Sequence, residues 1–304
     1  RIFTGAEVPN NADLVIMQEN ATICDKGVSF AQTPKQNDNI RPQGQDVQKG
    51  ARVLAKGIRL EPQHLGIIAS LGIEEITVFK ALKVGILTTG DELIAPGKIL
   101  DKGQIYNSNG PMLQALVEKL GYMVESYQHA NDNHAETESI LAKMALSCDI
   151  ILSSGGVSVG EEDHVKNVIE ANGELLLWKI AIKPGKPLVH GHVFDTPFIG
   201  LPGNPSSTLV TFHWFATIAL AVSSGLIVTP VQGFNIQASF SRHHSIKRDE
   251  FLRVSIVNGK AQAHPQQSSG ALSAACHSNG YLHIPAGEII EENKSFMFYP
   301  FSSF

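Results

Sequence analysis

The fold is decided by three stretches that share one design: KVGILTTGDEL (83–93), DIILSSGGVSVGEED (149–163) and TPFIGLPGNPSS (196–207). In each stretch an apolar run enters a tight turn of small residues, and a helical pattern follows. Connections between parallel strands are nearly always right-handed, so the three turns are expected at one edge of a single sheet. Ligands of open α/β sheets bind at that edge, outside the carboxyl ends of the strands. The sequence therefore predicts the position of its own active site.

The composition is that of an ordinary globular protein with more than one domain. The chain has 304 residues, of which 43% are hydrophobic and 17% are charged, and its formal net charge is −5. At about 100–200 residues per domain, two or three domains are expected. An acidic chain has no electrostatic footprint for nucleic acid, so we expect no nucleic-acid partner, and any anion site must be a local cluster of Lys and Arg.

Cysteine usage indicates a reducing compartment. The chain has three cysteines, Cys24, Cys148 and Cys276, which fit no C-x-x-C spacing and leave one thiol unpaired in any disulfide scheme. A cytoplasmic location is therefore expected.

We expect no membrane partner. The most apolar stretch, LVTFHWFATIALAV from Leu209, contains His213 and Thr217 and is shorter than the roughly 18 residues that a membrane span needs. It is interpreted as a buried helix.

The chain opens at Arg1, and its first residues, RIFTGAEVP, begin within a structural pattern instead of with a flexible polar tail. We therefore expect that an N-terminal segment is missing.

Four regions are predicted along the chain. Residues 1–46 form a β-rich lobe, 47–80 a linking strand and helix segment, 81–230 an α/β domain, and 231–304 a small β-barrel-like domain. The predicted fold class is thus a central α/β domain, with a mostly parallel sheet in three layers, flanked by a β-rich N-terminal lobe and a small all-β C-terminal domain.

Local patterns assign the individual elements. Strands are expected at ADLVIMQE (12–19), GARVLAKGIRL (50–60) and EEITVF (74–79), with a hairpin turn at Asp25, Lys26 and Gly27. Helices are expected over 61–72, 107–121, 134–147, 162–173 and about 205–222. Short C-terminal strands are expected at FNIQASF (234–240), EFLRVSIV (250–257), YLHIPA (281–286) and SFMFYPF (295–301).

The second turn is suited to phosphate. Backbone N–H groups at a strand end and the dipole of the following helix attract anions. The residues that would form this loop are Ser153, Ser154, Gly155, Gly156, Ser158 and Gly160. The stretch is not a P-loop, because Glu161 stands where the Lys would be. A turn that only lets a strand enter a helix is the structural alternative.

Acidic residues beside these turns imply a cation. Asp91 and Glu92 follow the first strand, and Glu161, Glu162 and Asp163 follow the second. Carboxylates would repel a phosphate unless a hard cation such as Mg²⁺ bridges them, and Mg²⁺ takes one or two carboxylates plus substrate oxygens. The alternative is that acids in a first helical turn only complement the helix dipole.

Two further segments point to an anion site at the same edge. WKIAIKPGKPLV places Lys179, Lys183 and Lys186 after an apolar strand, where like charges repel each other unless an anion or solvent neutralises them. A solvated surface is the alternative. The third turn, LPGNP, is made rigid by its prolines and precedes a helix. Its residues are Pro202, Gly203, Asn204 and Pro205.

Taken together and in this order, TGDEL, SSGGVSVGEED, KPGKP and LPGNP resemble the molybdopterin molybdenumtransferases, the family of MoeA and of the gephyrin E domain. RIFTGAEVP and NIRPQGQD also look like that family's second domain, so the resemblance covers nearly the whole chain. It implies the last step of molybdenum cofactor synthesis. In that step molybdate is inserted into adenylylated molybdopterin and AMP is released, with Mg²⁺ present.

The resemblance also implies roles for individual residues. Glu92 and Asp163 would be metal or acid/base carboxylates, with Asp132 as a further catalytic acid. Lys183 and Lys186 would hold molybdate or phosphate, with Lys179 nearby. Thr4, Arg41 and Asp46 would belong to a second lobe that faces the site.

Family members are homodimers, so a second copy is an implied partner, as are a molybdopterin-type small molecule and other proteins of molybdenum cofactor synthesis. Two other functions stay open: the related molybdopterin adenylyltransferase, which resembles only the central domain, and a scaffold module like that of gephyrin. The choice between molybdate and tungstate also stays open.

Overall fold

The structure is a computed structural model, and it describes residues 1–30, 33, 35–157 and 163–304. By internal contacts the chain divides into two compact units, Arg1–Ile58 and Arg59–Phe304. The finer boundaries near residues 46, 80 and 230 stay predictions.

The first unit contains little regular structure. A 3₁₀ turn, η1 (Gln18–Asn20), leads into β1 (Ala21–Cys24) and β2 (Gly27–Phe30), which pair in an antiparallel hairpin. The hairpin turn expected at residues 25–27 is confirmed. The strands expected at 12–19 and 50–60 are wrong, since the structure shows no strand there. None of the described residues of this unit is buried, so these short runs find neither a partner strand nor a core.

Helix α1 (Pro62–Ser70) opens the second unit at the expected place. Pro62 fits its first position because a missing N–H costs nothing there, and the His64 ring accepts a hydrogen bond from the Glu61 amide (2.9 Å). The strand expected at 74–79 is wrong. No strand is assigned to that segment, and its side chains are exposed.

A six-stranded sheet forms the centre of the second unit. Its order is β6-β3-β7-β11-β10-β8, in which β6, β3, β7 and β11 run parallel and β10 is antiparallel to both of its neighbours. The strands are β3 (Lys83–Thr89), β6 (Met123–Ala130), β7 (Ile150–Ser154), β8 (Gly173–Trp178), β10 (Val189–Val193) and β11 (Thr196–Leu201).

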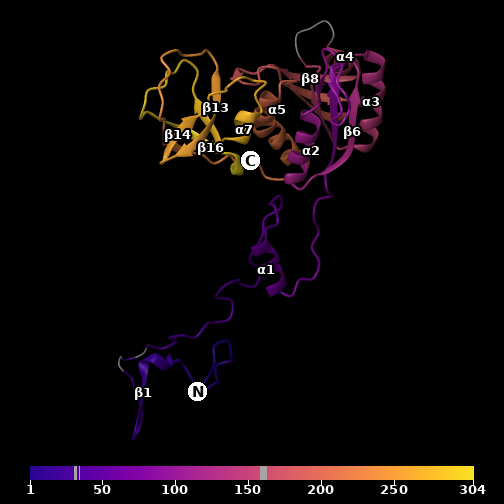
Figure 1. Cartoon of the computed structure of the whole chain (residues 1–304). Coiled ribbons are helices and arrows are strands. Elements are labelled where there is room, and N and C mark those ends of the chain that lie inside the picture. The colour runs from indigo at the N-terminus through magenta and orange to yellow at the C-terminus, as the bar shows by residue number, and fades with distance from the viewer. Residues whose placement is uncertain (31–32, 34, 158–162) are drawn as a thin grey trace. The chain divides into compact units, whose positions relative to one another are not determined.

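Helices cover both faces of this sheet, as Figure 1 shows for α3 on one side and α2 and α5 on the other. They are α2 (Asn109–Lys119), α3 (His134–Ser147), α4 (His164–Asn172), α5 (Pro205–Thr211) and α6 (Thr217–Ser223), with a π-helical segment η2 (Phe212–Ala216) between the last two. The predicted three-layer α/β class is confirmed.

Side chains of the central strands point alternately to the two faces of the sheet, so each strand contributes to the cores on both sides. On β7, Ile150 and Leu152 face the core under α2 and α6, whereas Ile151 faces the core under α3 and α4. Successive side chains of a strand point to opposite faces, so an apolar run such as IIL serves both cores at once.

The helical run 205–223 is long and apolar enough to cross a membrane by length and composition alone. Half of it is buried, and Phe212, Ala216 and Leu220 belong to one of the cores beside the sheet. This packing agrees with the interpretation of a buried helix.

The C-terminal domain is a second sheet, of order β12-β16-β15-β13-β14. Its strands are β12 (Phe234–Gln237), β13 (Asp249–Val257), β14 (Lys260–Ala263), β15 (Gly280–Ile284) and β16 (Ser295–Pro300). The sequence analysis missed β14 and the short helix α7 (Ser273–Cys276). A 3₁₀ turn, η3 (Phe301–Ser303), closes the chain, and β9 (Ile182–Lys183) from the α/β domain pairs with β13.

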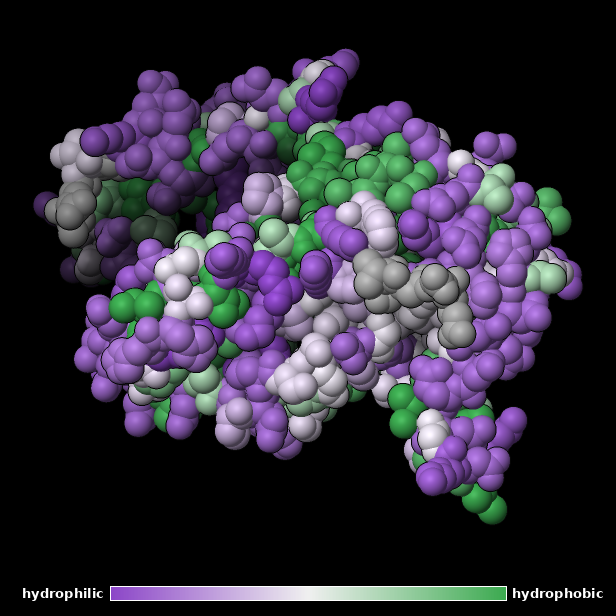
Figure 2. Space-filling view, turned by 90° about the horizontal axis from the view of Figure 1, so that it is seen from above, coloured by the Kyte–Doolittle hydropathy of each residue, from purple (hydrophilic) through white to green (hydrophobic). Residues whose placement is uncertain are grey.

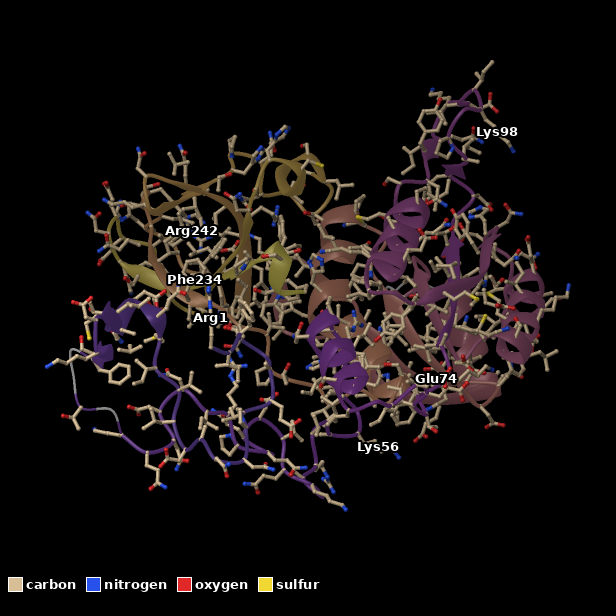
Figure 3. The ribbon with its side chains drawn as sticks, turned by 90° about the horizontal axis from the view of Figure 1, so that it is seen from below. Arg1, Lys56, Glu74, Lys98, Phe234 and Arg242 are labelled. Atoms are coloured by element: carbon tan, nitrogen blue, oxygen red, sulfur yellow. The ribbon has the colours of Figure 1, made fainter. Side chains whose placement is uncertain are left out.

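A small arm projects from the α/β domain. It is built on β4 (Leu93–Ile94) and β5 (Ile105–Tyr106), and Figure 3 shows Lys98 near its tip. The Tyr106 hydroxyl donates to the Lys98 carbonyl (2.8 Å) and closes the arm. Seen from above in Figure 2, the surface is mostly hydrophilic, with apolar patches of limited size.

The core assignment predicts a contrast between two leucines. Leu152 on β7 is 0% exposed, whereas Leu146 at the end of α3 is 90% exposed. We expect Leu152→Ala to lower the free energy of unfolding by about 2–5 kcal/mol, because it removes buried methyl groups and leaves a cavity. Leu146→Ala should change it by less than about 0.5 kcal/mol. Urea unfolding followed by circular dichroism measures both, and equal losses would contradict the assigned core.

Candidate active site

The three turns that decide the fold meet at one edge of the central sheet. β3 pairs in parallel with β7, and β7 pairs in parallel with β11, with Ser154 opposite both Thr88 and Leu201. The residues that follow these strands therefore leave the sheet side by side. This confirms that the turns share an edge.

Hydrogen bonds tie the second turn to the third. The Ser154 hydroxyl donates to the Pro202 carbonyl (3.1 Å), and the Gly155 amide donates to the Leu201 carbonyl (3.2 Å). The Gly155 amide was expected to face a ligand. Its partner shows instead that it joins the two loops, so this single expectation is wrong.

Gly155 and Gly156 allow this close approach. Both have positive φ angles, +95° and +63°, where a side chain is strained. A Cβ on Gly155 would meet the Thr89 carbonyl oxygen at 2.9 Å, and one on Gly156 would meet Val165 of α4 at 2.5 Å. Gly155 and Gly156 are therefore packed between the end of β3 and the first turn of α4.

Sequence reasoning missed one residue of this edge. The buried Asn109, at the start of α2, donates from Nδ2 to the Ser154 hydroxyl (2.8 Å) and to the Gly203 carbonyl (2.6 Å). It thus holds the second and third turns at a fixed spacing. The available signal was the NSN run, which was interpreted only as a helix start.

Asp163 has the most unusual environment of the predicted carboxylates. It precedes the first residue of α4, is only 6% exposed, and forms no capping hydrogen bond with the helix. Its Oδ2 has no hydrogen-bond partner in the part of the chain that the structure describes. Burial raises the pKa of this carboxyl to about 6, although Lys166 and His164 act in the opposite direction.

The acids after β3 and β6 are exposed and bound to each other's backbone. Asp91 Oδ1 accepts a hydrogen bond from the Asp132 amide (2.9 Å), and Asp132 Oδ2 accepts one from the Asp91 amide (3.4 Å). Glu92 is exposed, and its carboxylate lies back over Gly90. The ends of β3 and β6 are therefore linked, with Glu92 beside them.

The lysine segment emerges at the same edge. Val189, at the start of β10, pairs with Trp178 of β8 and with Gly200 of β11, so the segment 179–188 lies beside the LPGNP turn. Lys179 has a φ of +80° and lies over the Trp178 ring at 3.8 Å, and Lys183 forms an ion pair with Glu250 (3.0 Å). Lys186 is exposed.

The remaining predicted residues lie in the first unit or outside the described residues. Thr4, Arg41 and Asp46 are exposed in the first unit. Ser158 and Gly160 lie outside the described residues, as do Glu161 and Glu162. Their roles stay predictions.

Three family models match consecutive parts of the chain. The one described as MoeA N-terminal region (domain I and II) matches residues 1–72, the probable molybdopterin binding domain matches 85–221, and MoeA C-terminal region (domain IV) matches 235–301. A molybdopterin molybdenumtransferase from Haemophilus influenzae is 40% identical, with 95% of this chain and 75% of the relative covered. The chain belongs to the molybdopterin molybdenumtransferase family.

Other members agree with this assignment. The molybdopterin molybdenumtransferase of Staphylococcus aureus strain COL is 31% identical, with 94% of this chain and 70% of the relative covered. The crystal structure of the molybdopterin biosynthesis MoeA protein from Pyrococcus horikoshii OT3 matches with a TM-score of 0.80 and 29% identity, over 99% of this chain and 74% of that one. The resemblance drawn from the motifs is confirmed.

Asp163 fits the divalent cation that the family implies. In the described residues, no group of three His, Cys, Asp or Glu side chains is arranged to hold a metal ion alone. A buried carboxylate oxygen without a partner is nevertheless the ligand that such a cation needs, because Mg²⁺ completes its shell with substrate oxygens and water. Asp163 would therefore hold the cation, and the exposed Glu92 could supply a second oxygen.

The raised pKa of Asp163 predicts a pH-dependent effect of Asp163→Asn. The folded protein holds this proton more tightly than the unfolded chain, so the contribution of Asp163 to the free energy of unfolding falls as pH rises from about 4 to about 6. The Asn variant lacks this loss. Relative to the wild type, it should therefore gain more stability at pH 7.5 than at pH 4.5.

Urea unfolding at both pH values, with EDTA present, measures this difference. Asp195→Asn is the matched control, because Asp195 is exposed in the β10–β11 turn at the opposite edge of the sheet. A difference between Asp163→Asn and wild type that does not change with pH would show that Asp163 ionises freely.

Proposed function

We propose that this protein inserts molybdate into adenylylated molybdopterin and releases AMP. The observation that carries the proposal is the assembly of TTGDEL, the Gly155 turn, the lysine segment and LPGNP at one sheet edge. Asp163 follows the second of these turns, and its Oδ2 has no hydrogen-bond partner among the described residues. Names of relatives that cover most of the chain support it.

We propose a different task for each part of this edge. The rigid Gly155 and LPGNP turns, fixed by Asn109, form a wall for a phosphorylated ligand. Lys186 and Lys183 supply positive charge for an oxyanion, which in this reaction is molybdate or the phosphoanhydride. Asp163 and Glu92 would hold the cation, and Mg²⁺, when bound, would neutralise charge on the phosphoanhydride.

Adenylyl transfer is the less suitable alternative. The N-terminal and C-terminal family models match regions on both sides of the central domain, whereas an adenylyltransferase resembles only that domain. We further propose a cytoplasmic site of action, since Cys24, Cys148 and Cys276 are all free thiols.

Variants of Asp163 and Glu92 should affect catalysis without abolishing substrate binding. Asp163→Asn or Glu92→Gln removes a ligand of the cation and also removes repulsion toward an anionic substrate. We expect the insertion rate to fall on the order of 100-fold or more, the usual contribution of such groups, while pterin affinity persists. Molybdenum insertion and pterin binding are measured for each variant, with Asp195→Asn as the control. Near-normal insertion in both variants would make these acids structural.

We also propose that the protein acts as a homodimer. The first unit has no buried residue among those described, and Phe3, Ile23 and Phe30 expose large apolar side chains. Such a lobe gains stability by packing against another surface, and the family resemblance points to a second copy. Sedimentation equilibrium should give about twice the monomer mass of 32.8 kDa. A fully active monomer at micromolar concentration would contradict this.

A further inference from the structure

A buried carboxylate of the C-terminal domain contacts the lysine segment of the site. Glu250, on β13, is 2% exposed, and its Oε1 lies 3.0 Å from the Lys183 ammonium. Its Oε2 forms a second ion pair with Arg242, which Figure 3 shows within the C-terminal domain. Glu250 was not among the residues that the sequence singled out.

The backbone fixes this contact. β9 pairs in parallel with the start of β13, with Glu250 opposite Lys183 and Asp249 opposite Ile182. The Arg248 guanidinium also donates to the Ile182 carbonyl (3.0 Å). Lys183 is therefore attached to the C-terminal sheet, although its neighbours along the chain belong to the α/β domain.

The charges leave Lys183 able to bind an anion. Glu250 contributes one negative charge between two cations, so the group keeps a net positive charge. Lys183 is 39% exposed, whereas the carboxylate that holds it is buried. Loss of the carboxylate would let Lys183 and Arg242 repel each other, and the long lysine side chain would lose its fixed position.

We propose that Glu250 is a positioning residue that holds the Lys183 ammonium for the substrate oxyanion. The C-terminal domain thereby takes part in anion capture, although it supplies no atom to the reaction through this residue. This inference rests on the proposed function, because that function gives Lys183 its ligand.

The opposing view is that Glu250 only fastens the two domains together. An apolar cluster already does this, because Ile182 packs with Val210 of α5 and with Phe251 and Tyr281 of the C-terminal sheet. This cluster carries no charge, so a neutral residue at position 250 should leave the domains packed. A charge-specific effect on anion capture can then be measured in a folded protein.

The test is a double-mutant cycle with Glu250→Gln and Lys183→Met. Glu250→Gln should raise the molybdate KM by about tenfold or more, the usual effect of losing a charge-assisted hydrogen bond. Pterin affinity should stay within about twofold of wild type. In the Lys183→Met background, Glu250→Gln should raise the molybdate KM by less than about twofold. A residue that acts through Lys183 has no ammonium left to position in that variant. Glu250→Asp, which keeps the charge, should restore part of the loss.

Asp249→Asn is the matched control. It removes a carboxylate from the adjacent position of β13, where Asp249 contacts His283 at 3.0 Å instead of a lysine. It should leave the molybdate KM within about twofold of wild type. Equal effects of Glu250→Gln with and without Lys183, or an unchanged KM in Glu250→Gln, would overturn the proposal.

A second readout does not depend on turnover. Mass spectrometry after amine acylation should show that Glu250→Gln raises the reactivity of Lys183 several-fold relative to the exposed Lys143 on α3, because the ion pair no longer occupies the ammonium. Unchanged Lys183 reactivity would overturn the positioning role. If the wild type inserts no molybdenum, the proposed function fails, and the acylation result still decides whether Glu250 holds Lys183.

Discussion

The three turns of the candidate site depend on the parallel hydrogen bonding of β3, β7 and β11. Parallel pairing brings chain segments that are far apart in sequence to one edge, and the helices that follow must begin there. The bonds from Ser154 and Gly155 to residues 201–202, together with those from Asn109 to Ser154 and Gly203, then hold the starts of the second and third turns together. These contacts form when the protein folds, so a ligand that binds at this edge loses less free energy to ordering them.

Two buried carboxylates, Glu250 and Asp163, differ in whether the described structure pairs their charge with a cation. Glu250 lies between Lys183 and Arg242, so its burial is compensated by two ion pairs. Asp163 is buried with one oxygen unpartnered in the described structure, and its pKa is raised to about 6. An uncompensated buried charge is destabilising unless something binds it. This contrast supports the proposals that Asp163 takes part in the reaction and that Glu250 positions Lys183.

The sequence predicted the elements whose signals are local. Helix α3 has the predicted bounds because Asn133 caps it, accepting a hydrogen bond from the Glu136 amide, and its apolar positions fit one face. The strands expected at 50–60 and 74–79 failed because alternation is not sufficient: a strand also needs a neighbour to pair with. Both segments are without one in the described structure.

The residues of the site that stand in short motifs were predicted, and those defined by distant contacts were missed. Glycine turns, acids and lysines are visible in short motifs, and their arrival at one edge follows from the handedness of the connections. Asn109 and Glu250 were missed because their roles come from contacts with Ser154, Gly203 and Lys183, which are distant along the chain. The bond from the Gly155 amide to the Leu201 carbonyl was missed for the same reason.

The most direct measurement is a crystal structure of the protein with adenylylated molybdopterin bound. The account predicts that the phosphate oxygens lie within hydrogen-bonding distance of the loops that follow β3, β7 and β11, near Asp163 and Lys186. A pterin bound at the opposite edge of the sheet, beside the β10–β11 turn, would contradict the claim that the parallel strand ends form the active site.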